Sequence, residues 1–404
     1  FQAEDGIRDR SPSRGLGDVY KRQTTLKTLA PELGIYLLQV PAAQNADSLM
    51  TQMIADTRLL YAEFNYIGEA PEGNPRNISA WGGFDDSVYR QQSSLAYLGV
   101  SQAHNITRGS GVIVAVIDTG IQLDHPALKQ HILSTGYDFV DGDSVPDDVG
   151  NGLDDDADNA VDEMLGHGTH VAGIIHLIAP EAQIMPIRVL NSDGFGEFFA
   201  LAESIDYAVT HGANVINLSL GSSNSSDMLE EAIERASQRG VLVIAAAGNL
   251  NTNTHQYPAA EDCSLSVTSV NPEDVKSSFA NYGSWITLAA PGEAIYSAFP
   301  GNGYASWSGT SMATPFVAGQ AALIRAVAPS ADVLQIAALI FDTGKNIDPQ
   351  NTQFQGHLGQ RVNIGMSLEY WQIHGMPIIG DDEGLLDHDC SSNKAIIMIY
   401  LPMI

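Results

Sequence analysis

The sequence predicts an α/β fold in which a parallel β-sheet is flanked by helices on both faces. Four continuous apolar runs support this prediction, at Gly111–Ile117, Ile184–Leu190, Val215–Leu220 and Val241–Ala247. Runs without polar alternation are typical of strands buried on both faces of a parallel sheet. Segments with helical spacing lie between the runs, at Phe199–Thr210 and Asp227–Arg239. In such sheets, binding and catalytic residues gather at the carboxyl ends of the strands, so we look for them there.

The length and charge of the chain limit how many domains it can have and which partners it can bind. The chain has 404 residues, which suits one large domain plus a smaller unit. Its 48 acidic and 19 basic residues give a formal net charge of −29, so it would repel phosphate backbones and we expect no nucleic-acid partner. No apolar run approaches the roughly 20 residues of a membrane span. Two cysteines, Cys263 and Cys390, could pair or remain free.

The first 23 residues differ in balance from the rest of the chain. They hold five of the 19 basic residues but only four of the 48 acidic ones, and they resemble translated adapter sequence from a DNA library. We therefore predict that residues 1–23 are a non-native artefact and exclude them from the fold argument. On this hypothesis the natural N-terminus, with any signal peptide, is missing from the sequence.

Residues 24–84 predict a small α+β unit followed by a linker. Gly34–Val40 and Leu59–Tyr66 have strand-like composition, and Ala46–Thr57 between them has apolar residues at helical spacing. Those apolar residues are Leu49, Met50, Met53 and Ile54. The unit is too small to bury a core alone, so we expect it to dock on the large domain. Gly68–Gly83 is polar and contains Gly and Pro, which indicates a linker. The large domain is assigned to residues 85–371, and residues 372–404 stay unassigned.

Three motifs lie where the predicted strands end or helices begin. VAVIDTG places Asp118 at a strand end, GHGTHVAG places His167 between glycines before an apolar helix, and GTSMATPFVAG places Ser311 in a turn that enters a helix. A serine hydroxyl is a weak nucleophile that needs an imidazole to take its proton, and a carboxylate can orient that imidazole. The three motifs therefore contain the residue types that nucleophilic catalysis by a serine requires, although each motif alone is more often a turn, a surface loop or a helix cap.

In kind, order and spacing the motifs resemble those of the subtilisin-like serine proteases, the subtilase family (peptidase S8), over about residues 34–370. The resemblance implies a subtilisin-like fold and a serine endopeptidase with an acyl-enzyme intermediate. Ser311 would be the nucleophile, His167 the general base and Asp118 the group that orients it. Asn249, in the segment AAAGN, would donate its side-chain amide to the oxyanion. His170 lies three residues after His167, a spacing that could suggest a pair of zinc ligands. The Glu of the zinc motif H-E-x-x-H is missing, so we expect His170 to be structural.

The resemblance also implies how a polypeptide substrate binds. The implied substrate-binding residues are Ser219, Leu220, Gly221, Ala246, Ala247 and Gly248. The first three, together with Asp193–Phe195, would present edge backbone to an extended peptide. The last three would line the primary specificity pocket. Because none of them is charged, we expect broad or apolar specificity.

Two other functions remain open at this point. Asp342-Thr343-Gly344 repeats the triplet at Asp118, and two such triplets are typical of aspartic proteases, in which two carboxylates share a proton. That hypothesis leaves His167, Asn249 and Ser311 without a role. A catalytically inactive binding module of the same fold is the second alternative, and the intact catalytic positions argue against it.

The segment Asp138–Glu163 carries eleven acidic residues and no basic one. Within it Asp154, Asp156, Asp158 and Asp162 approximate the spacing of a calcium-binding loop, although Asn159 and Leu165 depart from the usual pattern. Charges at this density repel one another unless cations neutralise them. We therefore predict a structural calcium ion, with a solvated acidic loop as the alternative.

The position of residues 24–84, upstream of the large domain, completes the resemblance. The unit resembles the C-terminal part of a subtilase propeptide, a segment that assists folding and then occupies the active-site cleft as an inhibitor. We accordingly expect a zymogen that is secreted and monomeric and that cuts itself between about Ile67 and Tyr89. A permanent N-terminal subdomain is the alternative.

Overall fold

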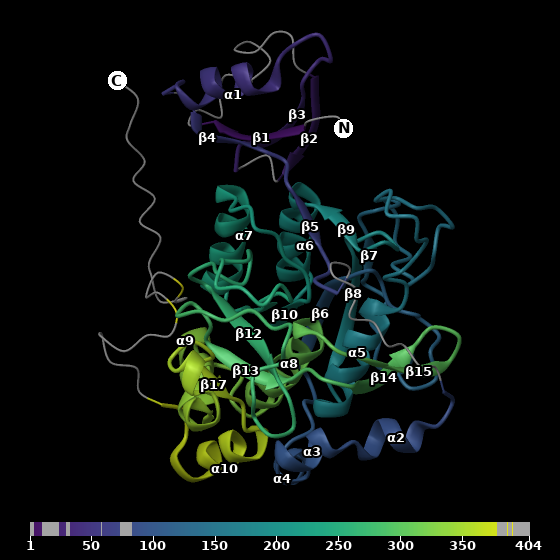
Figure 1. The fold of residues 1–404 in the computed structure, drawn as a ribbon, viewed down its shortest axis with the longest axis vertical. Coiled ribbons are helices and arrows are strands. Elements are labelled where there is room, and N and C mark those ends of the chain that lie inside the picture. The colour runs from purple at the N-terminus through teal and green to yellow at the C-terminus, as the bar shows by residue number, and fades with distance from the viewer. Residues whose placement is uncertain are drawn as a thin grey trace.

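The structure is a computed structural model that describes residues 4–9, 24–29, 33–57, 59–72 and 83–377, together with Leu386 and Cys390. Figure 1 shows a small N-terminal unit above a larger body that contains the main sheet. The extended strand β5 (Ile67–Glu69) runs from the small unit along the surface of the larger one.

The larger body is built on a nine-stranded sheet whose order is β16-β17-β13-β12-β11-β10-β6-β8-β7. All neighbours pair in parallel except the short edge strand β16, which is antiparallel to β17. The strands are β6 (Ile113–Asp118), β7 (Tyr137–Asp138), β8 (Gln183–Arg188), β10 (Val215–Leu218), β11 (Leu242–Ala246), β12 (Ser264–Val270), β13 (Leu288–Pro291), β16 (Lys345–Asn346) and β17 (Gln360–Arg361). The predicted parallel sheet is therefore confirmed.

Helices cover the sheet as the sequence predicts. The helices of the body are α2 (Asp86–Gln91), α3 (Ser93–Tyr97), α4 (Val100–His104), α5 (His167–Ile178), α6 (Phe198–Thr210), α7 (Asp227–Gln238), α8 (Thr310–Val327), α9 (Val333–Asp342) and α10 (Ile364–His374). Helix α8 crosses β10, β11, β12 and β13 and packs against α5, whereas α6 packs against α7. In Figure 1, α6 and α7 lie on the side of the sheet that faces the N-terminal unit.

The core of the body is made by the apolar runs that predicted the strands. Val114, Ile117, Ile216 and Ile244 are completely buried between the helical layers. The described residues also form two antiparallel strand pairs outside the main sheet: β14 (Ile295–Phe299) with β15 (Gly303–Trp307), and β9 (Phe195–Glu197) with β5. Burial of each large apolar side chain contributes about 1.5–3 kcal/mol to the free energy of folding. The apolar strands of the main sheet therefore hold the helical layers against it.

The N-terminal unit contains a four-stranded sheet of order β2-β3-β1-β4 and one helix. Its elements are β1 (Glu4–Asp9), β2 (Thr24–Leu29), β3 (Ile35–Gln39), α1 (Ala46–Ile54) and β4 (Leu59–Phe64). Leu49, Met50 and Met53 of α1 are buried against β3 and β4, but Ile54 is 68% exposed, which corrects its assignment to the apolar face. The segment excluded as an artefact contributes β1, which pairs with β3 and β4, while residues 10–23 lie outside the described residues.

The linker expected over residues 68–83 is not a linker in its first part. Gly68 pairs with Gly196 of β9, and Glu69 forms a bridge with Gly221, so this backbone is an added strand. The strand forms because the edge of β9 leaves backbone groups that an extended chain can satisfy. Residues 73–82 lie outside the described residues.

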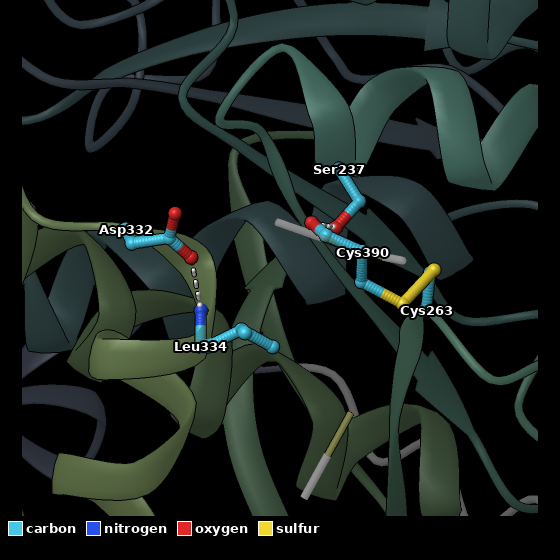
Figure 2. The surroundings of a disulfide bond; sticks show 5 residues. All are labelled: Ser237, Cys263, Asp332, Leu334 and Cys390. Carbon is cyan, nitrogen blue, oxygen red and sulfur yellow. Dashed lines mark hydrogen bonds between the residues drawn. A yellow bond between two sulfur atoms is a disulfide. The ribbon is translucent and has the colours of Figure 1, made fainter. Parts of the chain in front are cut away.

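The unassigned tail returns to the core. Helix α10 extends to His374, and Leu386 and Cys390 are both buried. Figure 2 shows Cys390 bonded to Cys263, which immediately precedes β12, with the backbone carbonyl of Cys390 accepting a hydrogen bond from Ser237 of α7 at 2.8 Å. The disulfide therefore answers the question that the two cysteines left open. Among the described residues, no helix is both long and apolar enough to cross a membrane.

Replacing Cys263 with Ser is expected to lower the free energy of unfolding by about 2–5 kcal/mol, because a cross-link between residues 127 positions apart restricts the unfolded chain. Chemical denaturation followed by circular dichroism measures the change. A reductant should destabilise the wild-type protein by a similar amount and leave Cys263→Ser unchanged. Equal stability of the two proteins under oxidising conditions would contradict the role given to this disulfide.

Candidate active site

The carboxyl end of β6 delivers a buried carboxylate to the first residue of α5. Asp118 Oδ1 accepts a hydrogen bond from His167 Nδ1 at 2.7 Å and from the Thr119 backbone N–H at 2.8 Å. Both side chains are completely buried. An Asp in this position holds the imidazole in one orientation and directs its other nitrogen, Nε2, toward the reacting groups.

A second buried carboxylate holds the start of α5. Asp148 accepts hydrogen bonds from the backbone N–H groups of Gly166 and Thr169 and from the hydroxyls of Thr169 and Thr119. Burial raises the pKa of Asp148 to about 7. Because the first N–H groups of a helix have no partner within the helix, this side chain satisfies them and positions His167. Sequence analysis missed Asp148, which lies in the loop that we interpreted by its charge alone.

The N-terminus of α8 carries the nucleophile. Ser311 is the second residue of the helix and is completely buried. Asn249, which follows β11, accepts hydrogen bonds from the Thr310 backbone N–H at 2.9 Å and from the Thr310 hydroxyl at 3.0 Å through Oδ1. Its Nδ2 is thereby turned toward the space beside Ser311. The backbone N–H of Ser311 and the amide of Asn249 form a pair of donors at a positive helix end.

Glu72 of the N-terminal segment occupies the centre of this arrangement. Its Oε1 accepts hydrogen bonds from Asn249 Nδ2 at 2.9 Å and from the Ser311 N–H at 3.3 Å. Its Oε2 accepts from Ser311 Oγ at 2.7 Å and contacts His167 Nε2 at 3.1 Å. The structure thus brings His167, Ser311 and Asn249 around one carboxylate, and Asp118 contacts the other side of the His167 ring.

The charge of His167 follows from its two neighbours. Burial lowers the pKa of His167, but Asp118 and Glu72 together raise it more, to about 10. His167 is therefore an imidazolium that donates from both ring nitrogens. His170, one turn along α5, differs: burial lowers its pKa to about 3, and its Nε2 lies near the carbonyls of Ile295 and Ala305 in the β14–β15 hairpin. Its role is structural, as the sequence predicts.

The predicted substrate-binding backbone lies along β5. Glu69 exchanges two hydrogen bonds of 2.9 Å with Gly221, and the Ala70 N–H donates to the Gly194 carbonyl at 2.9 Å. Ser219 Oγ donates to the Ser311 carbonyl at 3.0 Å, which ties the end of β10 to α8. Leu220, Ala246, Ala247 and Gly248 are buried, and the Gly248 N–H donates to the Thr310 hydroxyl.

The N-terminal unit also caps two helices of the body. Glu63 accepts hydrogen bonds from the Ser226 hydroxyl and from the N–H groups of Asp227 and Met228 at the start of α7. Asn65 Oδ1 accepts from the Phe199 N–H at 2.9 Å at the start of α6. These contacts need partners far apart in sequence, so no local pattern could have predicted them.

The carboxylates of the acidic segment Asp138–Glu163 have different environments: some are buried and paired, and three form a cluster near the surface. Asp138 is buried and paired with Arg188 at 2.9 Å. Oxygens of Asp154, Asp156 and Asp158 lie within 4.8 Å of one another near the surface, and repulsion adds to desolvation in raising the pKa of Asp156. Asp162 does not belong to this group; its carboxylate accepts hydrogen bonds from the N–H groups of Asn151 and Gly152.

The second Asp-Thr-Gly triplet does not join the site. Asp342 is exposed at the end of α9, whereas Asp118 is buried and bonded to His167. An aspartic protease needs two carboxylates that share a proton, so this arrangement gives no support to that alternative.

The sequence is similar to those of known proteins. Residues 109–359 match the Subtilase family, peptidase S8. The chain is 40% identical to thermitase of Thermoactinomyces vulgaris over 279 residues, which cover 67% of this chain and 92% of thermitase. It is 36% identical to a thermophilic serine proteinase of Bacillus sp. (strain AK1) over 322 residues, which cover 77% and 74% of the two chains.

Solved structures give the same result for the fold. A cold adapted subtilisin-like serine proteinase superposes with a TM-score of 0.56 at 34% identity, over 63% of this chain and 89% of that one. Fervidolysin from Fervidobacterium pennivorans superposes with a TM-score of 0.72 over 91% of this chain and 61% of that one. At 22% identity, the second likeness concerns the fold alone.

Replacing Asp148 with Ala is expected to lower the free energy of unfolding by about 1–3 kcal/mol, since buried donors at the start of α5 lose their acceptor. It should also lower kcat more than it changes KM, because His167 shifts with the helix. Thermal denaturation and steady-state peptide hydrolysis measure the two effects. Asp143→Asn, an exposed change in the same loop that keeps an oxygen for the Val145 N–H, should alter neither. An unchanged kcat in Asp148→Ala would contradict the positioning role.

Proposed function

Because the chain belongs to the subtilase family of serine endopeptidases, we propose that it hydrolyses peptide bonds with Asp118, His167 and Ser311 as its catalytic triad. The observation that supports this proposal is that His167 Nε2, Ser311 Oγ and Asn249 Nδ2 meet at the N-terminus of α8, while Asp118 holds the other ring nitrogen of His167. Nothing in the arrangement favours a non-catalytic binding module.

The reaction can begin only after Glu72 has left the position between Ser311, His167 and Asn249. His167, neutral and oriented by Asp118, accepts the Ser311 proton at Nε2 while Oγ attacks the scissile carbonyl carbon. The imidazolium that forms is stabilised by the Asp118 carboxylate. It then gives the proton to the leaving amine, and an acyl-enzyme on Ser311 remains. Water hydrolyses the acyl-enzyme by the same proton transfers.

The oxyanion is stabilised by the two donors that Glu72 engages. The Asn249 amide and the Ser311 N–H both donate to Oε1 of Glu72, and in the proposed reaction the carbonyl oxygen takes the place of this atom. Donors of this kind are already oriented before the reaction, so they act mainly on the transition state. Thr310 keeps Asn249 in this orientation through two hydrogen bonds.

Polypeptides are the proposed substrates, bound as an added strand beside Gly221 and Gly194. Support comes from β5, which makes these contacts with the chain's own backbone. Ala246, Ala247 and Gly248 carry no charge, which favours broad or apolar specificity. Secretion and a monomeric state belong to the same proposal, and the acidic surface is consistent with an extracellular protein.

Residues 24–72 are proposed to be a propeptide remnant that inhibits the enzyme and assists its folding. The caps that Glu63 and Asn65 place on α7 and α6 support this role, because they complete helices of the body. Insertion of the segment into the active site supports inhibition. Removal of the segment by self-cleavage would open the site.

Asp154, Asp156 and Asp158 would hold a calcium ion. Three carboxylates with oxygens within 4.8 Å of one another suit a hard cation with oxygen ligands. A bound ion would offset the repulsion in this loop, which leads directly to His167. Asp162 would support the loop through its backbone contacts and not as a ligand.

Ser311→Ala and His167→Ala are each expected to lower kcat by about 10⁶-fold, the scale measured for an enzyme of this family, and the double variant should be hardly worse. Asn249→Ala should lower kcat by about 10²–10³-fold with little change in KM, a magnitude also taken from this family. Hydrolysis of a chromogenic peptide measures all of these.

The variant Asn253→Ala changes an exposed residue and serves as the control for Asn249→Ala. Its kcat should match that of the wild-type protein.

Self-cleavage can be followed in the same preparations. The wild-type protein should lose its N-terminal segment and then begin between about residues 67 and 89, whereas Ser311→Ala should stay full length. Normal hydrolysis by Ser311→Ala would end the serine-protease proposal.

A chelator is expected to lower the melting temperature and to speed self-digestion, because an ion that binds only the folded state stabilises it. The stabilisation is about 2.7 kcal/mol when free calcium is a hundredfold above Kd. Replacing Asp154, Asp156 and Asp158 with Asn should abolish the sensitivity to the chelator, which scanning calorimetry detects. Asp143→Asn is the control and should keep it. Insensitivity of the wild-type protein would contradict a bound ion.

A further inference from the structure

The two oxygens of Glu72 occupy two chemically different positions. Oε1 lies between the donors that would stabilise an oxyanion, Asn249 Nδ2 and the Ser311 N–H. Oε2 lies between the nucleophile and the base, 2.7 Å from Ser311 Oγ and 3.1 Å from His167 Nε2. Four polar groups of the catalytic centre therefore converge on one carboxylate, and each can donate a hydrogen bond to it.

Burial and charge favour an anion in this position. Glu72 and His167 are both completely inaccessible to solvent. A buried carboxylate is costly unless it is paired and hydrogen-bonded, and here the imidazolium of His167 supplies the charge while the other three donors satisfy the oxygens. Gly309 makes room for it, because a Cβ at that position would lie 1.8 Å from Oε1.

The backbone before Glu72 determines where the carboxylate enters. The backbone of Glu69 exchanges two hydrogen bonds with Gly221, and the Ala70 N–H donates to the Gly194 carbonyl, so the chain is held three residues and two residues before Glu72. The segment before Glu72 is an extended strand. The Ser311 N–H and the Asn249 amide donate hydrogen bonds to the side chain of Glu72 and not to its backbone carbonyl. The contact is therefore different from that of a substrate whose carbonyl is about to be attacked.

We propose that the catalytic centre is also a binding site for a carboxylate group, and that the side chain of Glu72 is its built-in ligand. This inference rests on the proposed catalytic roles of Ser311, His167 and Asn249. The ligand class is a carboxylate carried on a peptide strand. Bound in this way, Glu72 blocks catalysis chemically: Ser311 gives its hydrogen to Oε2, His167 is already protonated, and the oxyanion donors are engaged.

Labelling of Ser311 by a fluorophosphonate tests the block in the full-length chain. The initial labelling rate is measured on the intact band, separated from shortened products by electrophoresis. Glu72→Gln keeps the shape of the side chain but removes its charge, so labelling should be faster by roughly tenfold or more. Asp47→Asn, which removes one charge from the exposed side of α1, should label like wild type. Equal rates for Glu72→Gln and wild type would overturn the proposal.

A second measurement does not need catalysis. In the full-length Ser311→Ala chain, the ring nitrogens of His167 are followed by NMR with and without Glu72→Gln. Loss of the carboxylate should lower the proton affinity of His167 by roughly tenfold, although Asp118 still contacts Nδ1 and His170 lies nearby. An unchanged titration in the folded protein would overturn the carboxylate site.

The two measurements separate this inference from the proposed function. If the NMR titration responds to Glu72→Gln but Ser311 is never labelled in any variant, the carboxylate site stands and the catalytic proposal fails. If Ser311 is labelled equally in all variants and the titration does not respond, the catalytic proposal stands and the carboxylate site fails.

Discussion

The parallel pairing of β6, β10 and β11 is the constraint on which the functional arrangement depends. Leu218 of β10 pairs with Ile117 of β6 and with Ala245 of β11, so the three strands end at the same edge. Asp118 is the last residue of β6 and Asn249 follows β11, while Ser311 of α8 is hydrogen-bonded to Ser219 at the end of β10. A shift of register by one residue in any of these strands would turn its side chains to the other face and dismantle the site.

The sequence was most informative where a motif determines its own local structure. Apolar runs buried on both faces predicted the sheet, and the glycines around His167 and Ser311 indicated turns into helices. The roles of Asp118, His167, Ser311 and Asn249 came from the resemblance to subtilases, and the geometry is consistent with them. The surface position of Ile54 was missed, because a helix in a small unit buries a narrower stripe than its composition suggests.

Contacts between distant residues could not be predicted in this way. Glu72 and Ser311 are 239 positions apart, and no spacing rule relates them. Asp148 was interpreted as one of many charges in an acidic loop, although it is buried and holds the start of α5. Burial of a carboxylate depends on donors that other segments supply. Charge density in a sequence therefore indicates a loop that needs neutralisation, but not which of its acids are neutralised by hydrogen bonds.

Among the described contacts between the N-terminal unit and the body, Lys27 and Glu203 form an ion pair at 3.5 Å, and several others join a side chain to a helix N-terminus. Glu63 and Asn65 bind helix N-termini, and apart from His167 the partners of Glu72 are uncharged donors. Residues 24–72 nevertheless have two basic and six acidic residues, a net charge of −4, within a chain of −29. Dissolved ions screen repulsion between exposed charges over about 8–10 Å but act weakly on buried hydrogen bonds. Added salt is therefore expected to weaken the repulsion between the two acidic parts more than it weakens the buried hydrogen bonds that join them.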